Sequence, residues 1–320
     1  MTRRRFVSGV AAGALAVGVP VVARAEATPL TIGYVPSTLF APVFLAAERG
    51  YLHDAGFNPT LTPIVAGQDA MALVSQSQLD LAAGALSAAF FNAVQRGLEV
   101  KYVASTAYQP AKGRPSALEV RQDLWDGGLR SLTALRGKKI GWIGGNGAAS
   151  AYYVARILRG AGMRLSEIEA VNVATPDQEV ALQRKAIDAV FTSAPFTELF
   201  VTRKEASILA SPPPGIAASG IFFGPALLHD SGRARAVLGA LRRAAGELAG
   251  AGWYAPASLA ACAKYTQQPP EMIAKSPRYE VRSDLRPDRE TALDMQREFI
   301  ADGFLSYTTP LPEPRLIATF

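Results

Sequence analysis

The chain has 320 residues, of which 49% are hydrophobic and 19% are charged, a balance typical of a globular protein with one large or two moderate domains. Its single cysteine, Cys262, excludes an intramolecular disulfide and a multi-cysteine metal cluster. Stability must therefore come from packing, and the formal net charge of +6 has to be interpreted with the N-terminus in mind.

The first 25 residues have the pattern of an export signal. Arginines at positions 3–5 precede Phe6, a weakly hydrophobic Ala/Gly/Val stretch follows, and small residues lead up to Ala25. A membrane anchor is the alternative, but the stretch is short, rich in glycine and interrupted by Pro20. We expect a twin-arginine signal that is cleaved after Ala25, with export to the periplasm.

Removing this signal changes the charge. Four of the 33 basic residues lie within it, so the mature chain has 29 basic and 27 acidic residues, a net charge of +2. No dense Lys/Arg patch with interleaved aromatics remains, so nucleic acid is not an expected partner. No later apolar run is long enough to span a bilayer, so we expect no membrane anchor after cleavage.

Strand-like and helical patterns alternate along the first part of the mature chain. The predicted strands are 30–35, 60–65, 79–84 and 100–106, and the predicted helices are 41–52, 69–78 and 87–97. The first helix should end near Gly50, Asp69 is a predicted N-cap of the second, and Gly97 closes the third. This alternation implies parallel strands with crossover helices, the α/β class.

The pattern restarts after a break. Strands are predicted at 116–121, 138–144, 168–174 and 187–193, and helices at 150–163 and 176–186. Residues 107–115 and 210–220 are rich in Pro, Gly and small residues, and they flank this block. Two such segments suggest two α/β lobes joined by two crossings, with a ligand in the cleft between them.

Four segments together carry a family resemblance. Residues 37–106, 135–163, 175–196 and 288–305 resemble, in order and spacing, the periplasmic substrate-binding proteins of ABC importers in the nitrate/sulfonate/taurine and thiamine-pyrimidine group. The resemblance implies the type II periplasmic-binding-protein fold, in which each lobe is a mainly parallel sheet flanked by helices. It places the first lobe at 28–108 and 217–320 and the second at 109–216.

The resemblance also implies a function. The protein would capture a small organic ligand, such as a sulfonate, an aromatic carboxylate or a heterocycle like a pyrimidine, and deliver it to the permease and ATPase of the same system. No cofactor or metal is implied, and we expect a monomer.

The glycine-rich loop at 144–147 is the most conspicuous short motif. No Lys-Ser/Thr follows it, as a Walker A loop requires, and it does not fit the dinucleotide pattern G-x-G-x-x-G. A strand, a tight turn and a helix with free N–H groups facing the cleft remain, and these groups suit the negative or electron-rich atoms of a ligand. The alternative is a turn that touches no ligand.

Two departures from the family pattern concern the pocket. Ala148 and Ala149 stand where the family often has hydroxyls, and Ser193, Ala194 and Pro195 stand where it often has a large aromatic residue and a glutamate before the proline. We therefore expect a roomier and less polar pocket than a nitrate site needs, in which backbone amides still hold a carboxylate or sulfonate.

Further candidates follow from loops at the carboxyl ends of strands, which line the crevice in open α/β sheets. Phe40 is either a pocket wall or a core residue, and Tyr108 either stacks on the ligand or braces the hinge. The full set of predicted contacts is Ser37, Thr38, Phe40, Gln68, Gly84, Ala85, Tyr108, Asn146, Gly147, Ala148, Ala149, Ser193, Ala194 and Pro195.

The residues typical of catalysis are sparse. His53 and His229 lack the spacing of a metal site and are expected at the surface, and Cys262 is expected to be a small core residue. An enzyme remains an alternative, because the wider superfamily includes desulfinases with a cysteine near the first loop and pyrimidine synthases with His and Cys clusters. Residues 36–42 here contain neither. A ligand-sensing partner of a membrane receptor is the other alternative.

Overall fold

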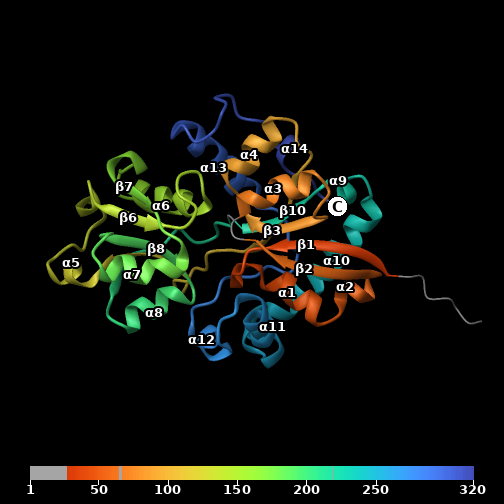
Figure 1. Ribbon diagram of the computed structural model, residues 1–320, viewed down its shortest axis with the longest axis horizontal. Helices are drawn as coiled ribbons and strands as arrows, with labels where there is room; N and C mark the ends of the chain where they lie inside the picture. Colours follow the sequence, from red (N-terminus) through yellow and green to blue (C-terminus); the bar gives the residue numbers. More distant parts are fainter. Residues whose placement is uncertain (1–26, 65–66, 218) are drawn as a thin grey trace, which may run out of the picture.

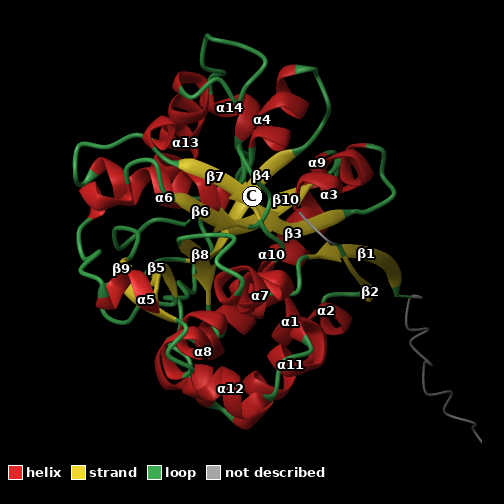
Figure 2. Cartoon of the chain, turned by 60° about the vertical axis from the view of Figure 1, so that its left-hand side comes forward, coloured by secondary structure: helices red, strands yellow, loops and turns green. Residues whose placement is uncertain are grey.

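The described residues, 27–64, 67–217 and 219–320, form two five-stranded sheets in a computed structural model of the chain (Figure 1). The strand orders are β2-β1-β3-β10-β4 and β7-β6-β8-β5-β9. Helices pack around both sheets (Figure 2), which confirms the predicted α/β fold with two lobes. The predicted export signal lies outside the described residues.

The first sheet contains one reversed strand. β1 pairs in parallel with β2 and β3, whereas β10 lies antiparallel between β3 and β4. The sequence did not predict β10, because its first residues fall in the Pro/Gly-rich segment assigned to a crossing. The strands are β1 Thr28–Tyr34, β2 Phe57–Pro63, β3 Leu81–Ala85, β4 Lys101–Ala107 and β10 Ser219–Phe223.

The second sheet has the same plan. β6 pairs in parallel with β7 and β8, and β5 lies antiparallel between β8 and β9. In each sheet, then, four strands run one way and one runs against them. The strands are β5 Ser116–Arg121, β6 Lys139–Trp142, β7 Glu169–Asn172, β8 Ala189–Ser193 and β9 Ala206–Ala210, of which β9 was not predicted.

The helices correct two expectations. The predicted helix 41–52 is two helices, because Gly50 adopts a left-handed φ of 72° between them. The helix predicted to begin at an Asp69 N-cap already begins at Gly67, so Asp69 lies inside its first turn. The helices are α1 Ala41–Glu48, α2 Tyr51–Asp54, α3 Gly67–Ser75, α4 Ala88–Gln95, α5 Gln122–Asp126, α6 Ala149–Arg159, α7 Gln178–Gln183, α8 Phe196–Thr202, α9 Pro225–Leu228, α10 Ser231–Leu248, α11 Pro256–Thr266, α12 Pro270–Lys275, α13 Arg289–Ala301 and α14 Glu313–Leu316. None of these helices is both long and apolar enough to cross a membrane.

Helix α13 joins the two lobes. It lies between α4 and α6 (Figure 1), and Phe299 of α13 belongs to one buried apolar cluster with Phe91 of α4 and Tyr152 of α6. Arg156 of α6 also forms an ion pair of 2.7 Å with Asp294 of α13. The C-terminal part of the chain therefore contributes to the contact between the lobes.

The segments that connect the sheets lie side by side. The N–H of Gln109 donates to Ile216 O at 2.9 Å, and the N–H of Gly215 donates to Gln109 O at 2.8 Å. A third segment joins them, because Tyr108 and Glu280 exchange two backbone hydrogen bonds. The two predicted crossings are thus hydrogen-bonded to each other, and the first of them also pairs with a stretch from the C-terminal part.

Candidate functional site

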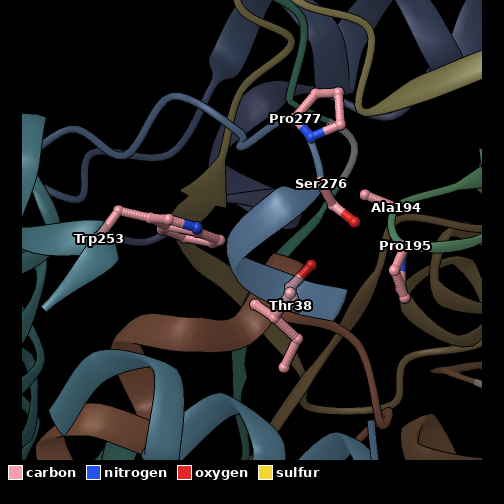
Figure 3. A pocket seen from close by; sticks show the side chains of 7 residues that line it. Thr38, Ala194, Pro195, Trp253, Ser276 and Pro277 are labelled. Carbon is pink, nitrogen blue, oxygen red and sulfur yellow. The ribbon is translucent and has the colours of Figure 1, made fainter. Parts of the chain in front are cut away.

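A small cleft lies where the two lobes meet (Figure 3). It encloses about 180 Å³ of empty space, open solvent included. The roomier and less polar pocket expected from the sequence stays a prediction. The lining residues are Thr38, Ala194, Pro195, Trp253, Ile273, Ser276 and Pro277.

Both lobes supply this lining. Thr38 follows β1 in a short 3-10 helix, which Ser37 caps by accepting a hydrogen bond from the N–H of Leu39 at 3.4 Å. Ala194 and Pro195 come directly after β8 and lead into α8. A ligand held in this cleft would touch both lobes at once.

The polar groups of the cleft are few. The hydroxyls of Thr38 and Ser276 are directed into the space beside Ala194 and Pro195 (Figure 3). Ser276 Oγ also donates to Met272 O at 2.8 Å. The surface offered to a ligand is therefore mostly apolar, with hydroxyls and one indole at its edges.

A buried hydroxyl cluster pins the C-terminal segment to the second lobe. Ser116 Oγ lies 2.8 Å from Tyr279 Oη and 3.2 Å from Ser193 Oγ, and Gln109 Nε2 donates to it at 3.0 Å. Tyr279 also donates to Pro115 O at 3.1 Å, and its burial raises its pKa. Tyr279 is thus neutral, and Ser193 belongs to this cluster at the hinge.

The glycine loop makes a different contact between the lobes. The N–H of Gly144 donates to Asn172 Oδ1 at 3.0 Å, and Trp142 Nε1 donates to Gly145 O at 2.9 Å, which fixes the loop. Gly147 O accepts a 2.8 Å hydrogen bond from the N–H of Ala88 in the first lobe. The loop therefore packs on α4, and none of its described residues lines the small cleft.

Five other predicted residues do not line the small cleft. Asn146 is exposed in the loop, whereas Ala148 and Ala149 are half-buried at the start of α6. Gly84 pairs with Gly220 in the first sheet, and the next residue, Ala85, ends β3. A ligand contact by any of these residues stays a prediction. The side chain of Gln68 lies outside the described residues.

Phe40 and Tyr108, the two residues with open alternatives, are both buried. Phe40 is 1% exposed and packs in the core of the first lobe, so it is a core residue and does not line the cleft. Tyr108 is 3% exposed, its hydroxyl donates to Arg286 O at 3.1 Å, and the Arg282 guanidinium lies 3.7 Å from the centre of its ring. Tyr108 therefore braces the hinge.

Sequence reasoning missed the lining residues that come from the C-terminal part. Trp253, Ile273 and Ser276 belong to no motif and reach the cleft only because that part folds back against the first loop. The one local signal was Trp253 itself, which follows three small residues in the 3-10 helix Gly250–Tyr254.

The candidate nucleophile and the histidines lie elsewhere. Cys262 is 2% exposed in α11, and burial raises its pKa to about 12, which confirms it as a small core residue. His53 and His229 are exposed, as predicted, and His229 Nε2 lies 2.5 Å from Glu99 Oε1. The described part of the chain contains no group of three or more His, Cys, Asp or Glu side chains that could hold a metal ion.

One carboxyl in the second lobe has an unusual environment. Glu119 on β5 is fully buried, and neither of its carboxyl oxygens has a hydrogen-bond partner among the described residues. Burial, with a smaller contribution from the charge of Glu198, raises its pKa to about 9. Glu119 is therefore protonated at neutral pH.

Comparison with known proteins agrees with this architecture. The family model described as NMT1/THI5 like matches residues 37–248, more than half of the chain, and the protein belongs to this family. The match confirms the suspected resemblance to the nitrate- and sulfonate-binding group. A search of curated proteins finds no match.

Solved structures share the fold at low sequence identity. The alkanesulfonate-binding protein SsuA from Xanthomonas axonopodis pv. citri, bound to MOPS, has a TM-score of 0.73 and 19% identity, covering 92% of this chain and 100% of its own. The nitrate-binding protein NrtA from Synechocystis PCC 6803 has a TM-score of 0.66 and 13% identity, and the match covers 89% of this chain and 84% of NrtA. The desulfurization enzyme DSZB has a TM-score of 0.60 and 16% identity, and the match covers 91% of this chain and 96% of DSZB.

Proposed function

We propose that the protein is the solute-binding component of an ABC importer, which captures a small organic ligand between its lobes. The observation that carries this proposal is the cleft lined by Thr38 from one lobe and by Ala194 and Pro195 from the other. A ligand that contacts both sides favours the closed arrangement over the open one, and a permease can read that difference.

The lining supports an organic ligand over a small inorganic ion. Ile273, Pro195 and Pro277 give the cleft an apolar surface. Nitrate is too small to contact all of this surface, so van der Waals contacts would be lost where space stays empty beside it. A sulfonate, an aromatic carboxylate or a heterocycle such as a pyrimidine would fill the space better. We therefore propose that nitrate binds poorly.

Export and partners complete the proposal. The arginines at 3–5 support twin-arginine export to the periplasm with cleavage after Ala25, and family membership supports delivery to a permease and an ATPase. We propose a monomer with lobes at 28–108 plus 217–320 and at 109–216. Replacing the arginines at 3–5 by lysine should leave precursor in the cytoplasm, and undiminished export would contradict this part.

The binding function can be tested by thermal unfolding of the exported protein. The panel comprises sulfonates, aromatic carboxylates, amides and pyrimidines, with nitrate included for comparison. A ligand present at about 100 times its dissociation constant should add about 2.7 kcal/mol to the free energy of unfolding. A panel in which no compound raises the midpoint would contradict the proposal.

The structural similarity to a desulfurization enzyme makes turnover the second candidate function. Each compound that binds should be incubated with the protein and then analysed by mass spectrometry. Recovery of the unchanged compound supports solute binding, whereas conversion that depends on the protein would establish an enzyme.

A further inference from the structure

Trp253 lines the cleft, and its indole N–H is a buried hydrogen-bond donor. We infer that the ligand is an uncharged molecule with a hydrogen-bond acceptor, and that the indole N–H of Trp253 donates to this acceptor. The inference concerns the same cleft and rests on the proposed function. It narrows the expected ligands to the uncharged compounds of the panel above, such as the amides.

The indole N–H of Trp253 lacks a hydrogen-bond acceptor among the described residues. Trp253 is 3% exposed and lines the cleft, and its Nε1 atom is buried with no acceptor among the described residues. Buried indole N–H groups usually find a partner, as that of Trp142 does at Gly145 O. A ligand that supplies an acceptor would remove this cost and so favour the closed arrangement.

The surrounding backbone does not supply the missing acceptor. Trp253 lies in the 3-10 helix Gly250–Tyr254, between α10 and α11. The carbonyl of Gly252 accepts from Ser258 Oγ at 2.8 Å, and the carbonyl of Gly250 accepts from Arg278 Nη1 at 2.7 Å. Both nearby carbonyls are thus engaged with other donors.

The charge of the cleft lining favours an uncharged ligand over an anion. Of the seven residues described as lining the cleft, none is charged. Lys275 next to it is exposed, and Arg278 donates to the Gly250 carbonyl. An anion here would lose its hydration without gaining a cationic side chain, which disfavours its binding.

The two hydroxyls fit an uncharged polar group. The Thr38 hydroxyl can donate to a carbonyl of the ligand or accept from its N–H, whereas the Ser276 hydroxyl, which donates its proton to Met272 O, can accept from an N–H. An amide, a lactam or a ring with a carbonyl beside an N–H offers this combination on a small, flat frame. Its carbonyl would take the Trp253 N–H.

Matched pairs of probes test the inference by calorimetry on the exported protein. Benzamide and uracil form the uncharged set, and benzoate, benzenesulfonate and orotate form the anionic set with the same rings. We expect the uncharged set to bind at least about tenfold more tightly. Trp253→Phe keeps most of the ring but removes the N–H, so it should weaken the uncharged set about tenfold. Trp125→Phe, the same change in α5, should have no effect.

A spectroscopic measurement keeps the test independent of the variant's folding. The chain has three tryptophans, so indole ¹⁵N labelling gives three N–H signals. The Trp253 signal should move downfield when an uncharged probe binds. Tighter binding by the anionic set, or an unmoved Trp253 signal with unchanged affinity in Trp253→Phe, would overturn the inference and leave the proposed function standing. Absence of binding by both sets would contradict the proposed function itself.

Discussion

The backbone N–H of Ala88, at the start of α4, donates a 2.8 Å hydrogen bond to the carbonyl oxygen of Gly147 in the glycine loop of the other lobe. Gly147 has a φ of 79°, and a Cβ atom there would lie 2.8 Å from the Cβ of Ala88. Glycine is required at this position for both its conformation and the close approach of the lobes. The glycine loop thus forms part of the contact between the lobes.

Gly147→Ala should weaken closure. The added Cβ has to displace α4, so we expect a larger radius of gyration by solution scattering and weaker ligand binding. Gly162→Ala is the matched control, because Gly162 has a φ of 68° and nothing within 4 Å of its added Cβ. Both variants should lose about 1 kcal/mol of stability through backbone strain. Equal radii of gyration for the two variants would refute a role in closure.

Asp294→Asn should loosen the contact between α6 and α13. Asp294 Oδ2 accepts from Tyr152 Oη at 2.8 Å and from Arg156 Nη1 at 2.7 Å. Burial acts to raise the pKa of Asp294, but the Tyr152 hydrogen bond and the charges of Arg156 and Arg159 outweigh it and lower the pKa. Removing the charge should cost about 1–3 kcal/mol in the free energy of unfolding, measured with urea.

The control for that variant is Arg297→Gln. Arg297 lies 3.4 Å from the same carboxylate, but its side chain is 59% exposed, so its loss should cost less than about 1 kcal/mol. If the two variants lose the same stability, the buried contacts of Asp294 do not hold α6 against α13.

Glu119→Gln should flatten the dependence of stability on pH. The folded pKa is about 9, above the ordinary value of 4.5, so the folded state keeps a proton that the unfolded state releases. Stability is therefore full below pH 4.5 and falls as the pH rises toward 9. At pH 7 the cost is about 3 kcal/mol. Urea unfolding between pH 5 and 9 measures the slope.

The control is Glu290→Gln, because Glu290 is exposed in the first turn of α13. This variant should keep the slope of the wild type. A Glu119→Gln protein whose stability still fell with pH as in the wild type would show that Glu119 does not titrate as its burial indicates.

Local patterns predicted most strands and helices but not how the strands pair. Apolar runs marked β1 and β8 correctly, because a strand buried on both faces needs them. β9 and β10 were missed, since β10 joins its sheet through residues more than a hundred positions earlier. Strand direction depends on such distant pairing, which the local sequence does not encode.

The sequence predicted only part of the cleft lining, because the other lining residues reach the cleft through tertiary packing. Thr38, Ala194 and Pro195 follow predicted strands, and loops at strand ends are where ligands bind in this class of fold. Trp253 and Ser276 follow no strand, and only tertiary packing brings them to the cleft. Phe40 comes from the same loop as Thr38 but turns into the core, which the sequence left undecided.

Calorimetric titration of Ala194→Trp tests the central claim most directly, because Ala194 lines the cleft between the lobes and is 8% exposed. The compound that binds the exported wild-type protein best should lose its binding when an indole fills the cleft. Ala134→Trp, at an exposed position of the second lobe, should bind as the wild type does. Unchanged affinity in Ala194→Trp would show that the ligand binds elsewhere and would contradict the account.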